Sequence, residues 1–203
     1  MKTKKQLAIF DLGGVVVDVE SDRLMHQIAQ IAGMSMDDVQ EIVYHKTLLK
    51  EFELGRIQPS EYFHGVKTKL RLPWTFEQFQ QFWNDILIEK KDTTALISRL
   101  KGRCKLSVLS NTNTLHLDHM KAKVGVLSGF DDIIGSFAVG MVKPDPEIYK
   151  LALKRAGVAA EAAVYVDDRP EMIAGGKGVG LHAIRFESAS QLERELRAVG
   201  LLD

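Results

Sequence analysis

Most of the chain alternates short apolar runs with helical patterns, and this alternation restricts the fold more than any other feature. Strand-like runs occur at Gln6–Leu12, Lys105–Ser110, Ala163–Val166 and His182–Phe186, with a weaker one at Ser136–Val142. Each run is almost continuously apolar, as expected of strands that are covered on both faces. Regular alternation of such strands with helices favours a parallel sheet between two helical layers. We therefore predict a doubly wound, Rossmann-like α/β core.

The helices predicted between these strands have recognisable ends. Asp145 is placed to cap a helix that has Pro146 at its first position and Gly157 after its last turn. Ser190 and Glu193 have the spacing of a capping box, which predicts the start of the C-terminal helix.

Residues 19–91 differ from the rest, because no convincing strand pattern occurs among them. Helix-start signals open three amphipathic stretches: Ser35-x-x-Asp38, which continues through Leu49, then Pro59-Ser60, and Thr75-x-x-Gln78. The third stretch carries Phe76, Phe79 and Trp83 at helical spacing, which is typical of core packing. We expect an all-helical domain, residues 19–91, inserted into a core formed by residues 1–18 and 92–203.

Composition excludes several classes of function. Lys plus Arg and Asp plus Glu each number 27, so no overall charge favours binding to nucleic acid or to an anionic membrane. The apolar segment Gln6–Val19 is too short and too interrupted to span a membrane. Cys104 is the sole cysteine, which excludes an internal disulfide and favours a reducing, cytoplasmic location. The sequence carries no signal of oligomeric state.

Polar residues follow the predicted strands where chemistry is expected. Asp11, Ser110 and the pair Asp167–Asp168 each stand at the end of an apolar run, and Lys143 lies between the second and third of these positions. Ligands of open α/β sheets bind beyond the carboxyl ends of the strands, so these side chains are expected to converge. Each residue alone has an ordinary structural explanation, but their combination points to a site.

These residue types suit phosphoryl transfer. An aspartate is ionised at neutral pH, so Asp11 can attack phosphorus without a separate base. A carboxylate and a phosphate repel each other, and Mg²⁺ held by the hard oxygen ligands of Asp167 and Asp168 would neutralise that repulsion. Ser110 can donate a hydrogen bond to a phosphoryl oxygen, and Lys143 can stabilise charge on the transferring group.

The four segments together resemble the haloacid dehalogenase-like hydrolase superfamily. They are Phe10-Asp11-Leu12-Gly13-Gly14, Leu109-Ser110-Asn111-Thr112, Lys143-Pro144-Asp145-Pro146 and Val164-Tyr165-Val166-Asp167-Asp168. The resemblance implies a metal-dependent phosphatase of a small phosphorylated metabolite, a sugar phosphate by preference. It makes Asp11 the nucleophile, and Ser110, Asn111 and Lys143 the substrate-binding residues. It also implies a Mg²⁺ site formed by Asp11, the Gly13 carbonyl, Asp167 and Asp168.

The resemblance extends to the helical insertion, which looks like the cap that closes over the site in this superfamily. Glu53-Leu54-Gly55-Arg56-Ile57 resembles a cap segment of its sugar-phosphatase-like branch. The first motif departs from the usual Asp-x-Asp pattern, because Gly13 replaces the second acid. We expect departure of the leaving group to rely on water, on a substrate group or on a cap side chain, and turnover to depend steeply on leaving-group acidity.

Three alternatives remain open from the sequence. A haloacid dehalogenase also uses the aspartate nucleophile without a second acid, but needs no metal and would leave Asp167 and Asp168 without a task. A degenerate relative that binds a ligand without turnover is compatible with Gly13. A response-regulator-like receiver uses similar residues, but its acidic pair comes first and no helical insertion interrupts it, so the order here disfavours it.

Overall fold

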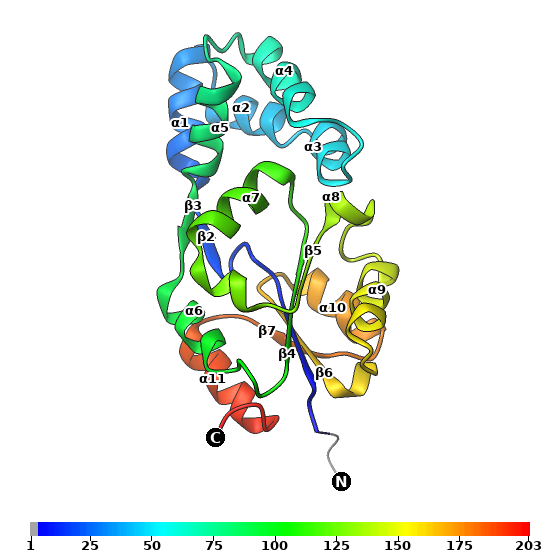
Figure 1. Cartoon of the computed structure of the whole chain (residues 1–203). Helices are drawn as coiled ribbons and strands as arrows, with labels where there is room; N and C mark the ends of the chain where they lie inside the picture. The colour runs from blue at the N-terminus through cyan, green and yellow to red at the C-terminus, as the bar shows by residue number, and fades with distance from the viewer. Residues whose placement is uncertain (1–3) are drawn as a thin grey trace.

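A parallel β-sheet forms the centre of the molecule (Figure 1). The structure is a computed structural model and describes residues 4–203, so residues 1–3 of the predicted core lie outside the described residues. Within this range, five parallel strands follow the order β5-β4-β1-β6-β7. They are β1 (Leu7–Phe10), β4 (Lys105–Ser110), β5 (Asp132–Gly135), β6 (Ala163–Asp167) and β7 (His182–Arg185). The predicted α/β fold class is confirmed.

The central strand β1 supplies side chains to an apolar cluster on each face of the sheet. Ala8 and Phe10 belong to one cluster, whereas Leu7 and Ile9 belong to the other. The first cluster includes residues from α6 (Lys91–Ser98), α7 (Thr114–Lys123) and α11 (Ala189–Ala198). The second includes residues from α9 (Pro146–Ala156) and α10 (Pro170–Gly178). Burial on both faces explains why this strand shows no polar alternation.

A second group of helices lies beyond the sheet, at the top of Figure 1. Its members are α1 (Ser21–Ala32), α2 (Met36–Val43), α3 (Lys46–Glu53), α4 (Pro59–Leu70) and α5 (Phe76–Asn84). These helices share an apolar cluster that contains Tyr62, Phe79 and Trp83. Phe79 and Trp83 are 1% and 2% exposed, which confirms their predicted role in packing. The Thr75–Gln78 capping box at the start of α5 is also confirmed.

The stretch predicted to run from Ser35 to Leu49 is interrupted. Ser35 caps α2 as expected, by accepting a hydrogen bond from the Asp38 amide, but α2 ends at Val43 and α3 begins at Lys46. The buried Tyr62 hydroxyl donates to the Val43 carbonyl at 2.6 Å and so satisfies one of the acceptors left open at the helix end. The sequence pattern alone does not reveal this tertiary contact.

The position expected for the weak strand is wrong in detail. The weak strand expected at Ser136–Val142 lies earlier, at Asp132–Gly135, and Ser136–Val139 instead forms the short helix α8. In α8 and just after it, Phe137 packs against one sheet cluster while Val139 and Met141 pack against the other, which explains the apolar run. The short 3₁₀ turns η1 (Gly125–Gly129) and η2 (Ala160–Ala162) complete the connections.

The C-terminal helix begins at a different cap from the one predicted. Ser188, not Ser190, caps α11 by accepting a hydrogen bond from the Gln191 amide at 3.2 Å. The Gln191 side chain in turn accepts a hydrogen bond from the Glu187 amide. The predicted cap is therefore two residues too late, because Ser190 lies inside the helix and Ser188 precedes it.

A small antiparallel pair of strands joins the two groups of elements. Strand β2 (Val17–Val19) pairs with β3 (Leu87–Glu89), so the expectation that residues 19–91 contain no strand is wrong. A three-residue strand is too short to produce a periodic pattern, and its pairing depends on a segment about 70 residues away. Lys90 adds an ion pair with Asp18, with 2.6 Å between Nζ and Oδ1.

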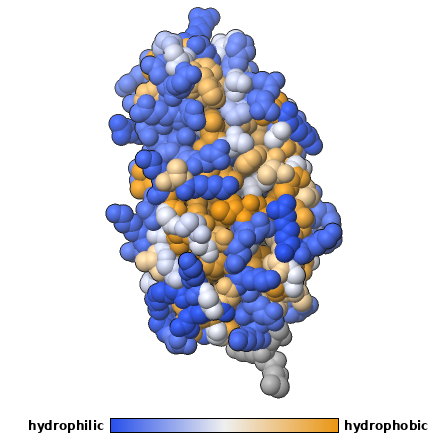
Figure 2. All heavy atoms as spheres, viewed as in Figure 1, coloured by the Kyte–Doolittle hydropathy of each residue, from blue (hydrophilic) through white to orange (hydrophobic). Residues whose placement is uncertain are grey.

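Every helix formed by residues 4–203 is too short or too polar to cross a lipid bilayer. Figure 2 shows a largely hydrophilic surface on the face in view, with hydrophobic residues gathered near its middle.

Replacement of Phe79 by alanine tests the packing of the helical group. We expect Phe79→Ala to lower the free energy of unfolding by about 3–5 kcal/mol, because a large buried ring leaves a cavity. Ile31→Ala, at a side chain that is 44% exposed, is the control and should change stability by less than about 0.5 kcal/mol. Urea denaturation measures both variants, and equal losses would contradict the packing described here.

Candidate active site

Three neighbouring strands deliver polar residues to one edge of the sheet. Asp11 follows β1, Ser110 ends β4 and Asp167 ends β6, and β1 pairs with the other two strands. The Asp11 amide donates to the Val166 carbonyl at 2.9 Å, which continues the β1–β6 register to the site. The parallel arrangement therefore brings together residues that are far apart in the sequence, as expected.

Lys143 lies at the centre of this group. Its Nζ is 2.6 Å from Oδ2 of Asp167 and 3.1 Å from Oδ1 of Asp11, and the side chain is almost fully buried. Two negative charges therefore compensate the buried lysine, as a desolvated charge requires. The Tyr165 hydroxyl also donates to Oδ2 of Asp167, and the Arg169 amide donates to Oδ1 of Asp167 at 2.9 Å.

Asn111 holds the backbone of Lys143 through its side-chain amide. Its Nδ2 donates to the Lys143 carbonyl at 2.9 Å, and its Oδ1 accepts from the Lys143 amide at 2.7 Å. This paired contact fixes the position of the lysine relative to β4. The sequence did not indicate this positioning role, and the substrate contact expected of Asn111 stays a prediction.

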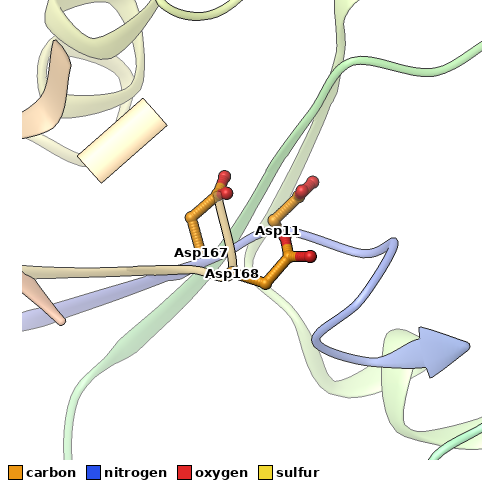
Figure 3. A group of neighbouring side chains, drawn as sticks. All are labelled: Asp11, Asp167 and Asp168. Atoms are coloured by element: carbon orange, nitrogen blue, oxygen red, sulfur yellow. The ribbon is translucent and has the colours of Figure 1, made fainter. Parts of the chain in front are cut away.

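The acidic side chains lie close together (Figure 3). Asp11, Asp167 and Asp168 each offer a carboxylate oxygen, and these oxygens lie within 4.8 Å of one another. Both oxygens of Asp167 have hydrogen-bond donors, as described above. Oδ1 of Asp168 differs, because it is buried and accepts no hydrogen bond from the described part of the chain. The buried Oδ1 of Asp11 lies 3.1 Å from the Lys143 ammonium.

Burial and mutual repulsion act on these carboxyl groups. Burial raises the pKa of Asp11 above its usual range, while the charge of Lys143 opposes this rise. Burial also raises the pKa of Asp168, and the charges of Asp167 and Asp11 add to the effect. A cation placed among these oxygens would favour the ionised form of both groups.

The two glycines after Asp11 have different steric surroundings. Gly14 has a φ of 75°, and a Cβ built there would lie 2.3 Å from Oδ2 of Asp168. A Cβ at Gly13 would meet its nearest neighbour, Cγ2 of Val19, at 3.4 Å, which is an ordinary contact. The close approach of Asp168 therefore requires glycine at position 14. At position 13 there is room for a Cβ, so crowding alone does not require glycine there.

The predicted site residues border a cavity of about 480 Å³. The predicted residues that line it are Asp11, Gly13, Ser110, Asn111, Lys143 and Asp168. Asp167 is not among the lining residues but accepts a hydrogen bond from Lys143, which is. The structure adds Glu53, His116 and Arg169 to the lining. Glu53 belongs to the segment that resembled a cap motif, and this resemblance was its signal in the sequence.

His116 lines the cavity with an uncharged imidazole ring. Its ring stacks on Trp83, with 5.2 Å between the ring centroids, and its Nδ1 lies 3.2 Å from Oδ1 of Asn84. Burial lowers the pKa of His116 to about 3. The histidine therefore belongs to the contact between α7 and α5.

The family model described as haloacid dehalogenase-like hydrolase matches residues 5–180 of the chain. The chain therefore belongs to this family and is a hydrolase, as the motifs predict.

Several curated relatives are named as phosphatases. The chain is 26% identical over 202 residues to D-ribitol-5-phosphate phosphatase of Bacteroides thetaiotaomicron, covering 94% of this chain and 96% of the relative. It is 37% identical over 156 residues to glyceraldehyde 3-phosphate phosphatase of Methanocaldococcus jannaschii, covering 76% of this chain and 60% of that protein.

A solved structure shares the fold. It is a HAD family enzyme of Bacteroides thetaiotaomicron in complex with magnesium and inorganic phosphate, with a TM-score of 0.80 and 22% identity. The match covers 93% of this chain and 98% of that enzyme.

The contrast between the two glycines gives a matched pair of variants. We expect Gly14→Ala to lower the free energy of unfolding by about 1–3 kcal/mol, because the left-handed φ and the contact with Asp168 both resist a side chain. Gly13→Ala should change stability by less than about 1 kcal/mol. Chemical denaturation of both variants measures the difference, and an equal loss at the two positions would contradict the geometry.

Proposed function

We propose that this protein is a Mg²⁺-dependent phosphatase of a small phosphorylated metabolite, with Asp11 as the nucleophile. The observation that carries the proposal is the buried Oδ1 of Asp168, which has no partner among the described residues and lies close to Asp11 and Lys143 at one cavity. A buried polar atom without a partner is costly, so this oxygen favours a bound cation.

In the proposed reaction, the ionised Asp11 carboxylate attacks phosphorus and the bond to the leaving oxygen breaks. The aspartyl-phosphate that results is then hydrolysed by water, which restores Asp11 and releases inorganic phosphate. Lys143 lies beside Asp11 and would stabilise charge on the transferring group, while Asp167 and Asn111 fix its position. The Ser110 hydroxyl, at the end of the adjacent strand, would donate to a phosphoryl oxygen.

The residues at the site fit a hard divalent cation. Carboxylate oxygens are the preferred ligands of Mg²⁺, and we assign Asp11 and Asp168 as the direct side-chain ligands with the Gly13 carbonyl as a backbone ligand. Asp167 was included in the predicted ligand set, but its hydrogen bonds to Lys143, Tyr165 and Arg169 favour a supporting role. When bound, Mg²⁺ neutralises the repulsion between carboxylate and phosphate and orients the two groups.

The relatives support a small polyol or sugar phosphate as the substrate. The two curated phosphatases compared above are named for ribitol 5-phosphate and glyceraldehyde 3-phosphate, both of them short hydroxylated phosphates. A cavity of about 480 Å³ lies within the range usual for small-molecule sites. We also propose that residues 19–91 act as the cap of this core, because Val19, Glu53 and Leu87 complete the cavity lining.

The alternatives from the sequence have weaker support. A dehalogenase would not need the carboxylate of Asp168 at the metal position, although that oxygen is buried beside Asp11. A degenerate binding protein would not need the nucleophile, the lysine and both acids together at one cavity. Gly13 is compatible with each reading, so it does not decide among them.

Loss of the nucleophile tests the first step. We expect Asp11→Asn to lower kcat by at least about 10³-fold, because a neutral amide is a poor nucleophile. Phosphate release from a panel of phosphorylated sugars and polyols measures the effect, and circular dichroism verifies the fold. Activity above a few per cent of the unmodified protein would overturn the role of Asp11.

Loss of a ligand tests the metal site. We expect Asp168→Asn to weaken Mg²⁺ binding by at least about tenfold, because a metal ligand loses its charge. Calorimetric titration with Mg²⁺ measures this directly, and chelation should stop turnover of the unmodified protein. Asp18→Asn, at a half-exposed residue paired with Lys90, serves as the control. Turnover that persists in excess chelator would favour the dehalogenase alternative.

A further inference from the structure

Gly13 removes the acid that usually follows the nucleophile in this family, and a different carboxyl group lines the same cavity. Glu53 stands at the end of α3 and borders the cavity together with Asp11 and Gly13. It comes from the helical group that lies beyond the sheet, whereas Asp11 and Gly13 belong to the β1 segment. A carboxyl-bearing residue of the helical group therefore borders the same cavity as Asp11 and Gly13.

The backbone of Glu53 is fixed to the core. The buried Ser136 hydroxyl donates to the Glu53 carbonyl at 2.6 Å, and the Thr112 amide donates to the same hydroxyl oxygen at 3.0 Å. This chain of contacts ties Glu53 to Thr112, two residues after Ser110. This contact holds the backbone of Glu53 in a defined position relative to the end of the sheet that carries Ser110.

Gly55 tightens the same contact. Its φ is 69°, and a Cβ built there would lie 2.2 Å from the Phe137 carbonyl oxygen in α8. Only a residue without a side chain allows α3 and the following turn to approach α8 so closely. The segment that carries Glu53 is thus packed directly on the core, as α5 is on α7 through Trp83 and His116.

We propose that Glu53 is the catalytic general acid and base of this enzyme and takes over the role left open by Gly13. The inference rests on the proposed phosphatase function. As Asp11 attacks phosphorus and the ester bond breaks, the Glu53 carboxyl gives its proton to the departing oxygen. The resulting carboxylate then takes a proton from the water that attacks the aspartyl-phosphate, so Glu53 returns to its acid form as inorganic phosphate leaves.

The electrostatic surroundings agree with this role. Burial raises the pKa of Glu53 to about 7, with the charge of Arg169 opposing the rise and that of Asp11 adding to it. A group that titrates near neutral pH can supply a proton in one step and accept one in the next. The position also explains how a first motif without its second acid can serve a working enzyme.

Leaving-group dependence is the readout that a merely structural residue would not change. The substrates are substituted phenyl phosphates of graded leaving-group acidity, which lack hydroxyl groups that Glu53 could bind. With Glu53 present, we expect kcat/KM to depend only weakly on leaving-group acidity, in place of the steep dependence expected from Gly13 alone. In Glu53→Gln, kcat/KM should fall by about 10²-fold or more for the poorest leaving group and little for the best.

Two further variants sharpen the test. Glu51→Gln, on the same helix but paired with Arg56 at the surface, should leave the series unchanged. Gly13→Asp in the Glu53→Gln background places a carboxyl group at the position usual in the family, where a Cβ fits. This double variant should raise kcat/KM for the substrates with poor leaving groups by at least about tenfold over Glu53→Gln alone. Thermal melting of each variant verifies that the proteins are folded.

The outcomes separate the two levels of the proposal. An equal loss for all leaving groups in Glu53→Gln, or no loss for the poorest one, would overturn the assignment of Glu53 while leaving the phosphatase intact. Failure of the unmodified protein to hydrolyse any member of the series with Mg²⁺ would overturn the proposed function, and the role of Glu53 with it.

Discussion

The buried contacts of Lys143 with Asp167 and Asp11 set the geometry of the whole site. Removing one partner of such a buried charged group costs about 3–5 kcal/mol, because the remaining charges lose their compensation. Three adjacent strands must therefore end at the same level to bring these groups together, and the β4-β1-β6 order does this. The Asn111 clamp and the Tyr165 hydroxyl hold the lysine and Asp167 in place. The sheet thus determines which oxygens stay free to bind a cation.

Asp167 and Asp168 are adjacent in sequence but occupy different surroundings. Asp167 ends strand β6, next to the central strand β1, and is fully buried, so its oxygens face donors from within the protein. Asp168 lies one residue further on, packs against Gly14 and keeps an oxygen without a partner. Asp167 thereby compensates the charge of Lys143, whereas Asp168 is available to bind the metal ion. This division explains why a pair of acids, and not a single one, ends this strand.

Much of the architecture was predictable because central strands such as β1 are apolar on both faces and leave a clear signal. The convergence of Asp11, Ser110 and Lys143 followed from the rule for parallel sheets. Strand β3 was not predictable, because it has three residues and pairs across a long separation. The carbonyl of Val43, at the break between α2 and α3, accepts a hydrogen bond from the distant Tyr62 hydroxyl, and that of Glu53 accepts one from Ser136. Contacts between distant segments leave no local pattern, so the sequence identified the Glu53 segment but not its task.

The account as a whole depends on a covalent intermediate at Asp11, and trapping that intermediate is its most direct test. The protein would be mixed with Mg²⁺ and an aryl phosphate, quenched in acid during turnover and reduced with borohydride, which converts an aspartyl-phosphate to homoserine. Peptide mass spectrometry then locates the modified residue. We predict homoserine at Asp11 and unmodified aspartate at positions 167 and 168. Modification of another carboxylate, or none at Asp11 while phosphate is being released, would contradict the mechanism.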